Sequence, residues 1–291
     1  MGEAWFMGET RQMYPQLLGD LEKLSADEIQ KPMADIASGY SAFGPMDEWY
    51  QWYHYLLPQM LPRCHDGNIV ASVVEILVTD FIAIYPNGVR VAPYKTFRED
   101  TLRTLGRCMM EPQCWNGREI VVGEMLWRNN RNPAGIWGWS DTSGDFSASM
   151  FFCLKYLPAE LVRGWMRSVL EIPDPHWRAQ IMVWAVGAYD LLAGKVQWPA
   201  ELKEFGRTTA TWDWSHCLRA EIATRDESDA PPMAALLPDA AREDALDILR
   251  GHFSEDVFLE WLESISRVDY LHAELLEIPS TFENRFVGER R

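Results

Sequence analysis

The sequence predicts an all-α protein, either an irregular helical array or a solenoid of antiparallel helix pairs, with one long loop rich in Trp, Gly and Asn. Three observations lead to this prediction. Apolar residues recur at helical spacing along most of the chain, several of these stripes follow helix start signals, and 47% of the 291 residues are hydrophobic, including 14 Trp. A chain of this length buries a substantial core, so we expect the aromatic stripes to face inward.

Helical stripes begin close to the N-terminus. Ser25 and Glu28 form the S-x-x-E pattern of a capping box, which would open a second helix. The first helix, which precedes this box, carries an apolar face of Met13, Leu17, Leu18, Leu21 and Leu24.

Three pairs of helices are predicted in the middle of the chain. Thr96 and Glu99 repeat the capping-box pattern before one of them. The apolar segment from Ile69 to Tyr85 is assigned to helix because it is longer than a usual strand. The pairs are 47–61 with 67–85, 97–110 with 113–128, and 158–170 with 174–193.

This succession of helix pairs resembles a degenerate HEAT or armadillo-type array with one insertion, over residues 46–193. The resemblance is architectural and rests on no specific motif. Non-repetitive packing of helices explains the same pattern, so both architectures stay open at this point.

The clearest stripes lie near the end of the array and near the C-terminus. Asp174 followed by Pro175 is an N-cap with proline in the first turn, and Ser254 is a second N-cap candidate. Behind the first cap we expect a buried stripe of Trp177, Ile181, Trp184, Ala188 and Leu191. Behind the second we expect Phe258, Trp261, Leu262, Ile265 and Val268.

Residues 128–145 interrupt the helical pattern and form the most informative segment. Long loops inside a domain are often functional, and indole faces beside carboxylates suit sugars or cationic groups. A simpler alternative is that the Trp side chains plug the loop onto the core and that Asp145 caps a helix beginning at Phe146. The candidate ligand-binding residues are Arg128, Arg131, Trp137, Trp139, Asp141 and Asp145.

The domain organisation follows from charge and turn residues. Residues 1–224 are predicted to form the helical array that contains the 128–145 insertion, and 225–232 is a polar linker candidate ending in two Pro. Residues 233–291 form an acidic C-terminal helical unit packed on the array, unless the two are one continuous domain. The segment from Glu221 to the C-terminus supplies most of the net charge of −16.

Composition argues against several classes of partner. A net charge of −16 disfavours binding to nucleic acid through its phosphates. No apolar run is long enough to span a bilayer, and the N-terminal residues lack the pattern of a secretory signal. The five Cys are scattered, with no C-x-x-C motif. We therefore expect a cytoplasmic protein with no nucleic-acid and no membrane partner.

The sequence gives little support for metal or cofactor chemistry. Cys64 with His65 and His216 with Cys217 are adjacent pairs, whose side chains point apart on a helix or strand. We therefore predict no metal site and no cofactor. No common hydrolase, zinc, dinucleotide or Walker motif occurs, which weakens an enzymatic role without excluding an unfamiliar enzyme.

Three functions fit these observations. The favoured one is a non-catalytic interaction protein, of an inhibitor or immunity type, that binds a basic protein partner through an acidic surface. The alternative is an enzyme or small-molecule binder with a pocket lined by the 128–145 loop. The third is an assembly protein whose exposed aromatic residues form an oligomer interface.

Overall fold

The computed structural model of the chain describes three long blocks, 140–197, 235–267 and 278–287, which are mostly helical. Between residues 115 and 146 it describes only some of the residues, and for these it describes the backbone alone. The other described residues are 14–25, 28, 29, 32, 55, 56, 77, 78, 81, 82, 85, 87–92, 94–106, 115, 116, 119, 120, 127, 128, 137 and 138.

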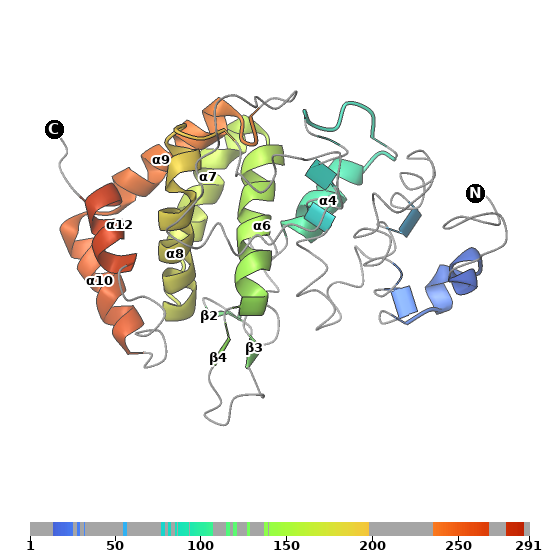
Figure 1. Ribbon diagram of the computed structural model, residues 1–291, viewed down its shortest axis with the longest axis horizontal. Helices are drawn as coiled ribbons and strands as arrows, with labels where there is room; N and C mark the ends of the chain where they lie inside the picture. The colour runs from blue at the N-terminus through green and yellow to red at the C-terminus, as the bar shows by residue number, and fades with distance from the viewer. Residues whose placement is uncertain are drawn as a thin grey trace.

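Helix α8, Pro175–Leu192, is the central element of this part of the fold (Figure 1). It begins at the predicted cap, where the backbone N–H of Trp177 donates to Oδ1 of Asp174 at 3.1 Å. It packs against α6, α9, α10 and α12. The predicted stripe is confirmed, because Trp177, Ile181, Trp184, Ala188 and Leu191 are all buried. Further buried residues lie on its other faces, as expected of a helix enclosed by neighbours.

Helix α6, Ser140–Tyr156, is enclosed in the same way, since every residue from Ser147 to Lys155 is buried. Helix α7, Ala159–Leu170, is amphipathic and lies at the surface. Both α7 and α8 match the predicted third pair. However, α7 packs mainly against α9, Asp239–His252, and meets the start of α8 where Nε1 of Trp177 donates to the carbonyl of Val169 at 2.8 Å.

The C-terminal helices α10, Glu255–Ser266, and α12, Ile278–Phe286, pack against α8. The predicted cap of α10 is confirmed, because the backbone N–H of Val257 donates to Oγ of Ser254 at 3.3 Å. Phe258, Trp261 and Ile265 of the predicted stripe are buried, Leu262 is half-buried, and Val268 lies outside the described residues.

The predicted first helix is wrong in type. Two short 3-10 helices, η1 Pro15–Leu18 and η2 Leu21–Lys23, occupy this segment. Gly19 ends η1 with an extended backbone, and a glycine in the middle of this segment does not favour a continuous α-helix. Leu17 and Leu21 are buried, whereas Leu18 is 46% exposed.

The capping box that follows is confirmed. The backbone N–H of Ser25 donates to Oε2 of Glu28 at 2.8 Å, and the backbone N–H of Glu28 donates to Oγ of Ser25 at 3.3 Å. The Ser25 hydroxyl also donates to Oε2 of Glu28 at 2.8 Å, and the backbone N–H and the hydroxyl of Ser25 together lower the pKa of the Glu28 carboxyl. In the second predicted capping box, the side chain of Thr96 has a different hydrogen-bond partner from the predicted Glu99. Helix α4, Phe97–Leu105, begins after Thr96 as predicted, but Oγ1 of Thr96 donates to Oδ2 of Asp100 at 2.8 Å.

The helix predicted over 113–128 is wrong at every described position. Strands β1, Trp115–Asn116, and β2, Glu119–Ile120, pair antiparallel, and β3, Trp127–Arg128, pairs with β4, Trp137–Gly138. In the sequence, two residues, Gly117 and Arg118, separate the paired strands, and a two-residue loop that starts with glycine is typical of a hairpin.

Figure 1 shows the order of the main helices in space, from α10 through α8 and α6 to α4. The prediction of an all-α protein is confirmed for the described part of the chain, which is helical apart from the two-residue strand pairs. Among the described residues, no helix has the length and apolarity needed to cross a bilayer. The region proposed as a linker, 225–232, lies outside the described residues.

Candidate functional site

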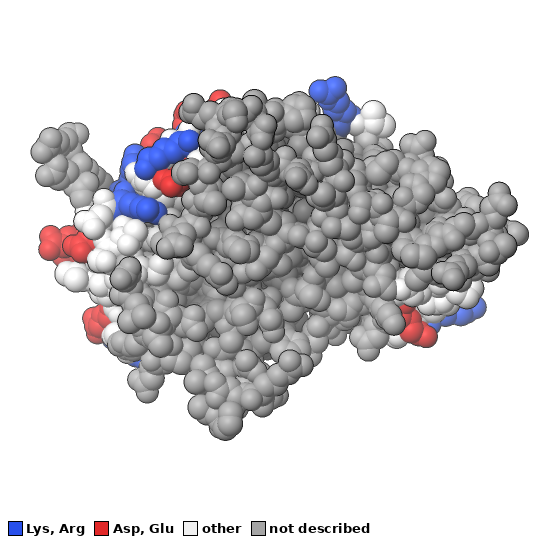
Figure 2. Space-filling model, viewed as in Figure 1, with Lys and Arg blue, Asp and Glu red and all other residues white. Residues whose placement is uncertain are grey.

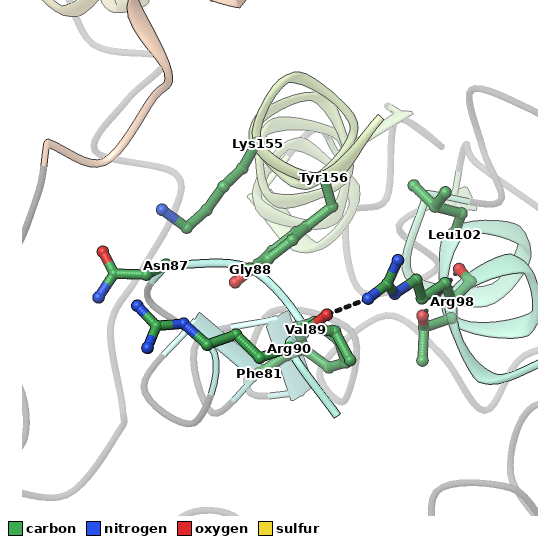
Figure 3. A pocket seen from close by; sticks show the side chains of 10 residues that line it. Phe81, Asn87, Gly88, Val89, Arg90, Arg98, Leu102, Lys155 and Tyr156 are labelled. Atoms are coloured by element: carbon green, nitrogen blue, oxygen red, sulfur yellow. Dashed lines mark hydrogen bonds between the residues drawn. The ribbon is translucent and has the colours of Figure 1, made fainter. Parts of the chain in front are cut away.

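A pocket of about 260 Å³ opens between α4, the C-terminal end of α6 and residues 87–90 (Figure 3). Among the described residues that line it, three side chains are cations and none is acidic, although the chain carries a net charge of −16. We call this site the basic pocket. It is lined by Phe81, Asn87, Gly88, Val89, Arg90, Arg98, Thr101, Leu102, Lys155 and Tyr156.

Lys155 is the buried cation of the basic pocket. Its position on the enclosed helix α6 leaves it only 8% exposed. Its Nζ donates to the carbonyl oxygen of Leu236, just before α9, at 2.7 Å, and lies 5.7 Å from the ring centroid of Tyr156. Burial disfavours the charged form of an amine, and it lowers the pKa of Lys155 to about 8.

Aromatic side chains form one wall of the basic pocket. The rings of Phe81 and Tyr156 meet edge to face with centroids 5.0 Å apart, and Phe81 also contacts the rings of Phe97 and Phe152. The Tyr156 hydroxyl donates to the carbonyl of Tyr85 at 2.9 Å. Burial raises the pKa of Tyr156, so this hydroxyl stays protonated and the wall is held in place by both packing and a hydrogen bond.

The rim of the basic pocket is a tight turn anchored to α4. The backbone N–H of Gly88 donates to the carbonyl of Tyr85 at 3.1 Å, and Gly88 has φ of 84°, a region that favours glycine. Nη2 of Arg98 donates to the carbonyl of Val89. Figure 3 shows Arg98 reaching across to this carbonyl, while the polar ends of Asn87, Arg90 and Lys155 lie on the other side of the turn.

An acidic surface lies on the opposite side of the described fold. We call Glu255, Asp256, Leu259, Glu260 and Glu263 the acidic face of α10; all five are exposed. Figure 2 shows red atoms at the left edge of the molecule, where Figure 1 places α10. On α9, the exposed Asp239, Glu243 and Asp247 follow one another at intervals of one turn.

The arginines of the C-terminal helices are already engaged within the fold. Arg242 contacts Asp239 and Glu243, each at 3.2 Å, and Arg267 contacts Glu263 at 2.6 Å. Arg285 donates to the carbonyl of Val186 at 2.6 Å, and Arg250 donates to the hydroxyl of Tyr189 at 3.3 Å. The carboxylates of Glu255 and Asp256, in contrast, make no ion pair within the described residues.

Glu260 and Arg178 connect the acidic face to the core. Nη2 of Arg178 lies 2.9 Å from Oε1 of Glu260, and the guanidinium stacks 5.4 Å from the ring centroid of Trp261. Arg178 is 8% exposed. The pKa of the nearby His252 is lowered, mainly because burial disfavours its charged form. The charge of Arg178 lowers this pKa further, whereas the charges of Glu171 and Glu260 raise it.

The structure describes four of the six predicted ligand-binding residues, by backbone only. Arg128 and Trp137 lie opposite each other in the β3–β4 pair. Asp141 and Asp145 lie in α6. Arg131 and Trp139 lie outside the described residues.

The prediction that Asp145 caps a helix beginning at Phe146 is wrong, because α6 already begins at Ser140. Residues 140–145 therefore belong to this helix and not to the predicted loop. Ser, Asp and Thr are typical both of turns and of the first turn of a helix. Their concentration here was therefore an ambiguous signal.

The sequence reasoning missed Lys155. A usable signal was present, because this lysine stands inside the apolar run from Met150 to Leu157, and a charged residue in such a run on a buried helix needs an internal partner. The other charged residues of the basic pocket, Arg90 and Arg98, lack such a signal, because both are exposed and neither lies on a buried helix.

Among the described residues, no cluster of three or more His, Cys, Asp or Glu side chains has a geometry suited to a metal ion. Cys153 is buried, with Sγ 4.0 Å from the carbonyl oxygen of Gly106. The Cys–His pairs at 64–65 and 216–217 lie outside the described residues.

Comparison with models of known protein families gives no match for this sequence, and comparisons with curated proteins and with solved structures give none either.

Proposed function

We propose that the protein is a non-catalytic interaction protein that binds a basic protein partner through the acidic face of α10. One observation carries this proposal. The described arginines of α9, α10 and α12 all bond within the fold, whereas the carboxylates of Glu255 and Asp256 stand exposed at the start of α10 without an ion pair in the described structure.

The chemistry of the acidic face indicates the kind of partner. Leu259 is 54% exposed and lies among the carboxylates one turn away on either side. A basic segment that also presents an apolar side chain matches this pattern, since its cations would meet the carboxylates while its apolar group covers Leu259. Charge complementarity of this kind mainly speeds association and selects the partner.

A solvated helix face is the simplest competing explanation, because exposed carboxylates also keep proteins soluble. The two explanations differ in a measurable way. A docking surface binds a basic protein that is released when salt screens the charges, whereas a solvated face binds nothing specific.

The experiment compares the wild-type chain with Glu255→Gln/Asp256→Asn and with the control Glu99→Gln/Glu160→Gln. Each double variant removes two exposed carboxylates from the first turn of described helices, so the change in net charge is the same. Immobilised proteins are incubated with native lysate at low and high ionic strength, and bound proteins are identified and their affinity is then measured with purified components.

We expect a basic partner that binds the wild type and the control at low salt and dissociates from both at high salt. Its affinity for Glu255→Gln/Asp256→Asn should be at least about tenfold lower than for the wild type. Absence of a salt-sensitive basic partner would contradict the proposal. Equal loss of binding in both double variants would also contradict it, because only net charge would then matter.

Two other functions remain predictions. A ligand pocket lined by residues 128–145 depends on side chains outside the described set. An oligomer formed through exposed aromatics is tested by the mass of the chain in solution. A HEAT-like array stays a prediction as well; α8 contacts helices as far along the chain as α12, whereas repeats of a solenoid contact mainly their neighbours.

A further inference from the structure

The basic pocket concentrates positive charge in a chain that is otherwise strongly acidic. Elsewhere in the described structure, arginines such as Arg163, Arg178 and Arg242 pair with carboxylates. In the pocket, Lys155, Arg90 and Arg98 line one cavity, and no described acidic side chain lines it with them. Arg90 is exposed and makes no hydrogen bond or ion pair within the described residues. Like charges gathered in this way repel one another unless an anion lies between them.

The pocket also has a volume and an apolar wall that suit a small organic molecule. Its volume of about 260 Å³ lies just below the usual range for ligand sites, which begins at about 300 Å³. Phe81, Leu102 and the ring of Tyr156 supply apolar surface, while Lys155 supplies a buried charge. Ligand sites commonly combine an apolar lining with a few polar groups that fix orientation.

We propose that the basic pocket binds a small organic anion, with its phosphate or carboxylate group held by Lys155, Arg90 and Asn87 and its apolar part against Phe81 and Tyr156. Figure 3 shows the polar ends of Lys155, Arg90 and Asn87 on the same side of the turn. Asn87 adds an amide donor to the two cations.

Arg98 is a positioning residue in this arrangement. Its guanidinium is used to hold the Val89 carbonyl, and Val89 is the residue directly before Arg90. The bond ties the rim of the pocket to α4, so that the Arg90 side chain is presented from an anchored turn. A preorganised rim reduces the entropy lost when a ligand binds.

Lys155 has a structural role that must be separated from ligand binding. Its bond to the Leu236 carbonyl connects α6 to the segment before α9, so replacing it affects folding whether or not an anion binds. Arg90 has no such structural contact in the described residues, which makes it the decisive residue. A bound anion would favour the charged form of Lys155 and so oppose the effect of burial, which lowers its pKa to about 8.

The test measures binding of phenyl phosphate, benzoate and inorganic phosphate to the full chain by isothermal titration calorimetry in a low-chloride buffer. Benzyl alcohol is the uncharged probe. The variants are Arg90→Gln and Lys155→Gln, and the matched control is Lys95→Gln, which removes an exposed cation near the same turn that does not line the pocket.

We expect the wild type and Lys95→Gln to bind an aromatic anion more tightly than inorganic phosphate and not to bind benzyl alcohol. Arg90→Gln should bind about tenfold or more weakly, since it loses a charge-assisted hydrogen bond. Comparing the affinities of phenyl phosphate and benzoate shows whether the pocket prefers a phosphate or a carboxylate. Thermal melts show which variants are folded; if Lys155→Gln is unfolded, Arg90→Gln decides.

Three results would overturn the inference. The first is that no anion binds the wild type. The second is that Arg90→Gln binds as tightly as the wild type, and the third is that Lys95→Gln is weakened as much as Arg90→Gln. Binding of inorganic phosphate as tightly as of both aromatic anions would refute the organic part of the proposal, because the apolar wall would then contribute nothing.

Discussion

Cations gather inside a cavity beside α6, whereas carboxylates stand on the outer side of α10, at the other end of the row of helices in Figure 1. In the C-terminal helices, each described arginine meets a carboxylate, a carbonyl or a hydroxyl of the fold. In the basic pocket, Arg90 has no such partner among the described residues. The net charge of −16 therefore does not predict the local charge of either site. The local charge depends on which charged side chains the fold pairs internally.

The largest expected difference between the two regions concerns their apolar residues. Phe81 is 1% exposed and contacts four aromatic rings, whereas Leu259 is 54% exposed. We expect Phe81→Ala to lower the free energy of unfolding by about 3–5 kcal/mol. We expect Leu259→Ala to change it by less than about 0.5 kcal/mol.

Urea denaturation of both variants measures this difference, with Phe81→Leu as the conservative control. A Phe81→Ala variant as stable as Leu259→Ala would mean that the wall of the pocket is not part of the core. The comparison between an inner and an outer site would then fail.

The next effect concerns the buried charge and has a defined sign. The pKa of Lys155 is about 8 in the folded chain, below its ordinary value of 10.5, so the unfolded chain binds more protons between these values and stability rises with pH there. Tyr156, whose ring lies beside the amine, stays neutral in this window because burial raises its pKa.

Between about pH 7.5 and about pH 9.5, the wild type should gain about 2 kcal/mol of stability relative to Lys155→Met. Denaturation curves for both proteins at the two pH values give this quantity, because effects common to both cancel in the difference. Lys95→Met, at an exposed lysine, is the control. A wild type that gains nothing over Lys155→Met would show that the amine is solvated.

The smallest effect concerns the start of α10. Ser254→Ala removes the acceptor for the Val257 N–H and should cost about 1 kcal/mol, whereas Ser254→Asp retains a capping oxygen and should cost much less. Fraying of this turn would also loosen Glu255 and Asp256, so Ser254→Ala should weaken binding of the basic partner while leaving the basic pocket unaffected. Urea denaturation and the two binding assays check these outcomes, and equal stability of both variants would contradict the capping role.

Much of the helical framework could be predicted because its signals are local. The caps at Ser25, Asp174 and Ser254 each involve residues within three positions of one another, so the amino-acid types specify the contact almost directly. The stripe of α8 could be predicted for a similar reason, since helical spacing alone places Trp177, Ile181 and Trp184 on an inward face.

The errors arose where one residue pattern fits two structures. Residues 115–128 have apolar spacing that fits a helix, but the two residues between β1 and β2 begin with Gly117, which is typical of a hairpin. At 140–145, residues typical of turns also suit the first turn of a helix, and α6 begins there. The partner of α7 could not be foreseen either, because contact with α9 depends on shape matching across a long separation in the chain.

The sequence by itself determined the positions of several helix starts, the inward faces of α8 and α10, and the excess of negative charge. Only the tertiary structure brought Phe81, Arg90, Arg98 and Lys155 to one cavity and engaged the C-terminal arginines within the fold. The physical reason is that capping and periodicity act over a few residues of one helix. A pocket and its electrostatic environment, in contrast, depend on how separate segments pack and on which charges lose contact with water.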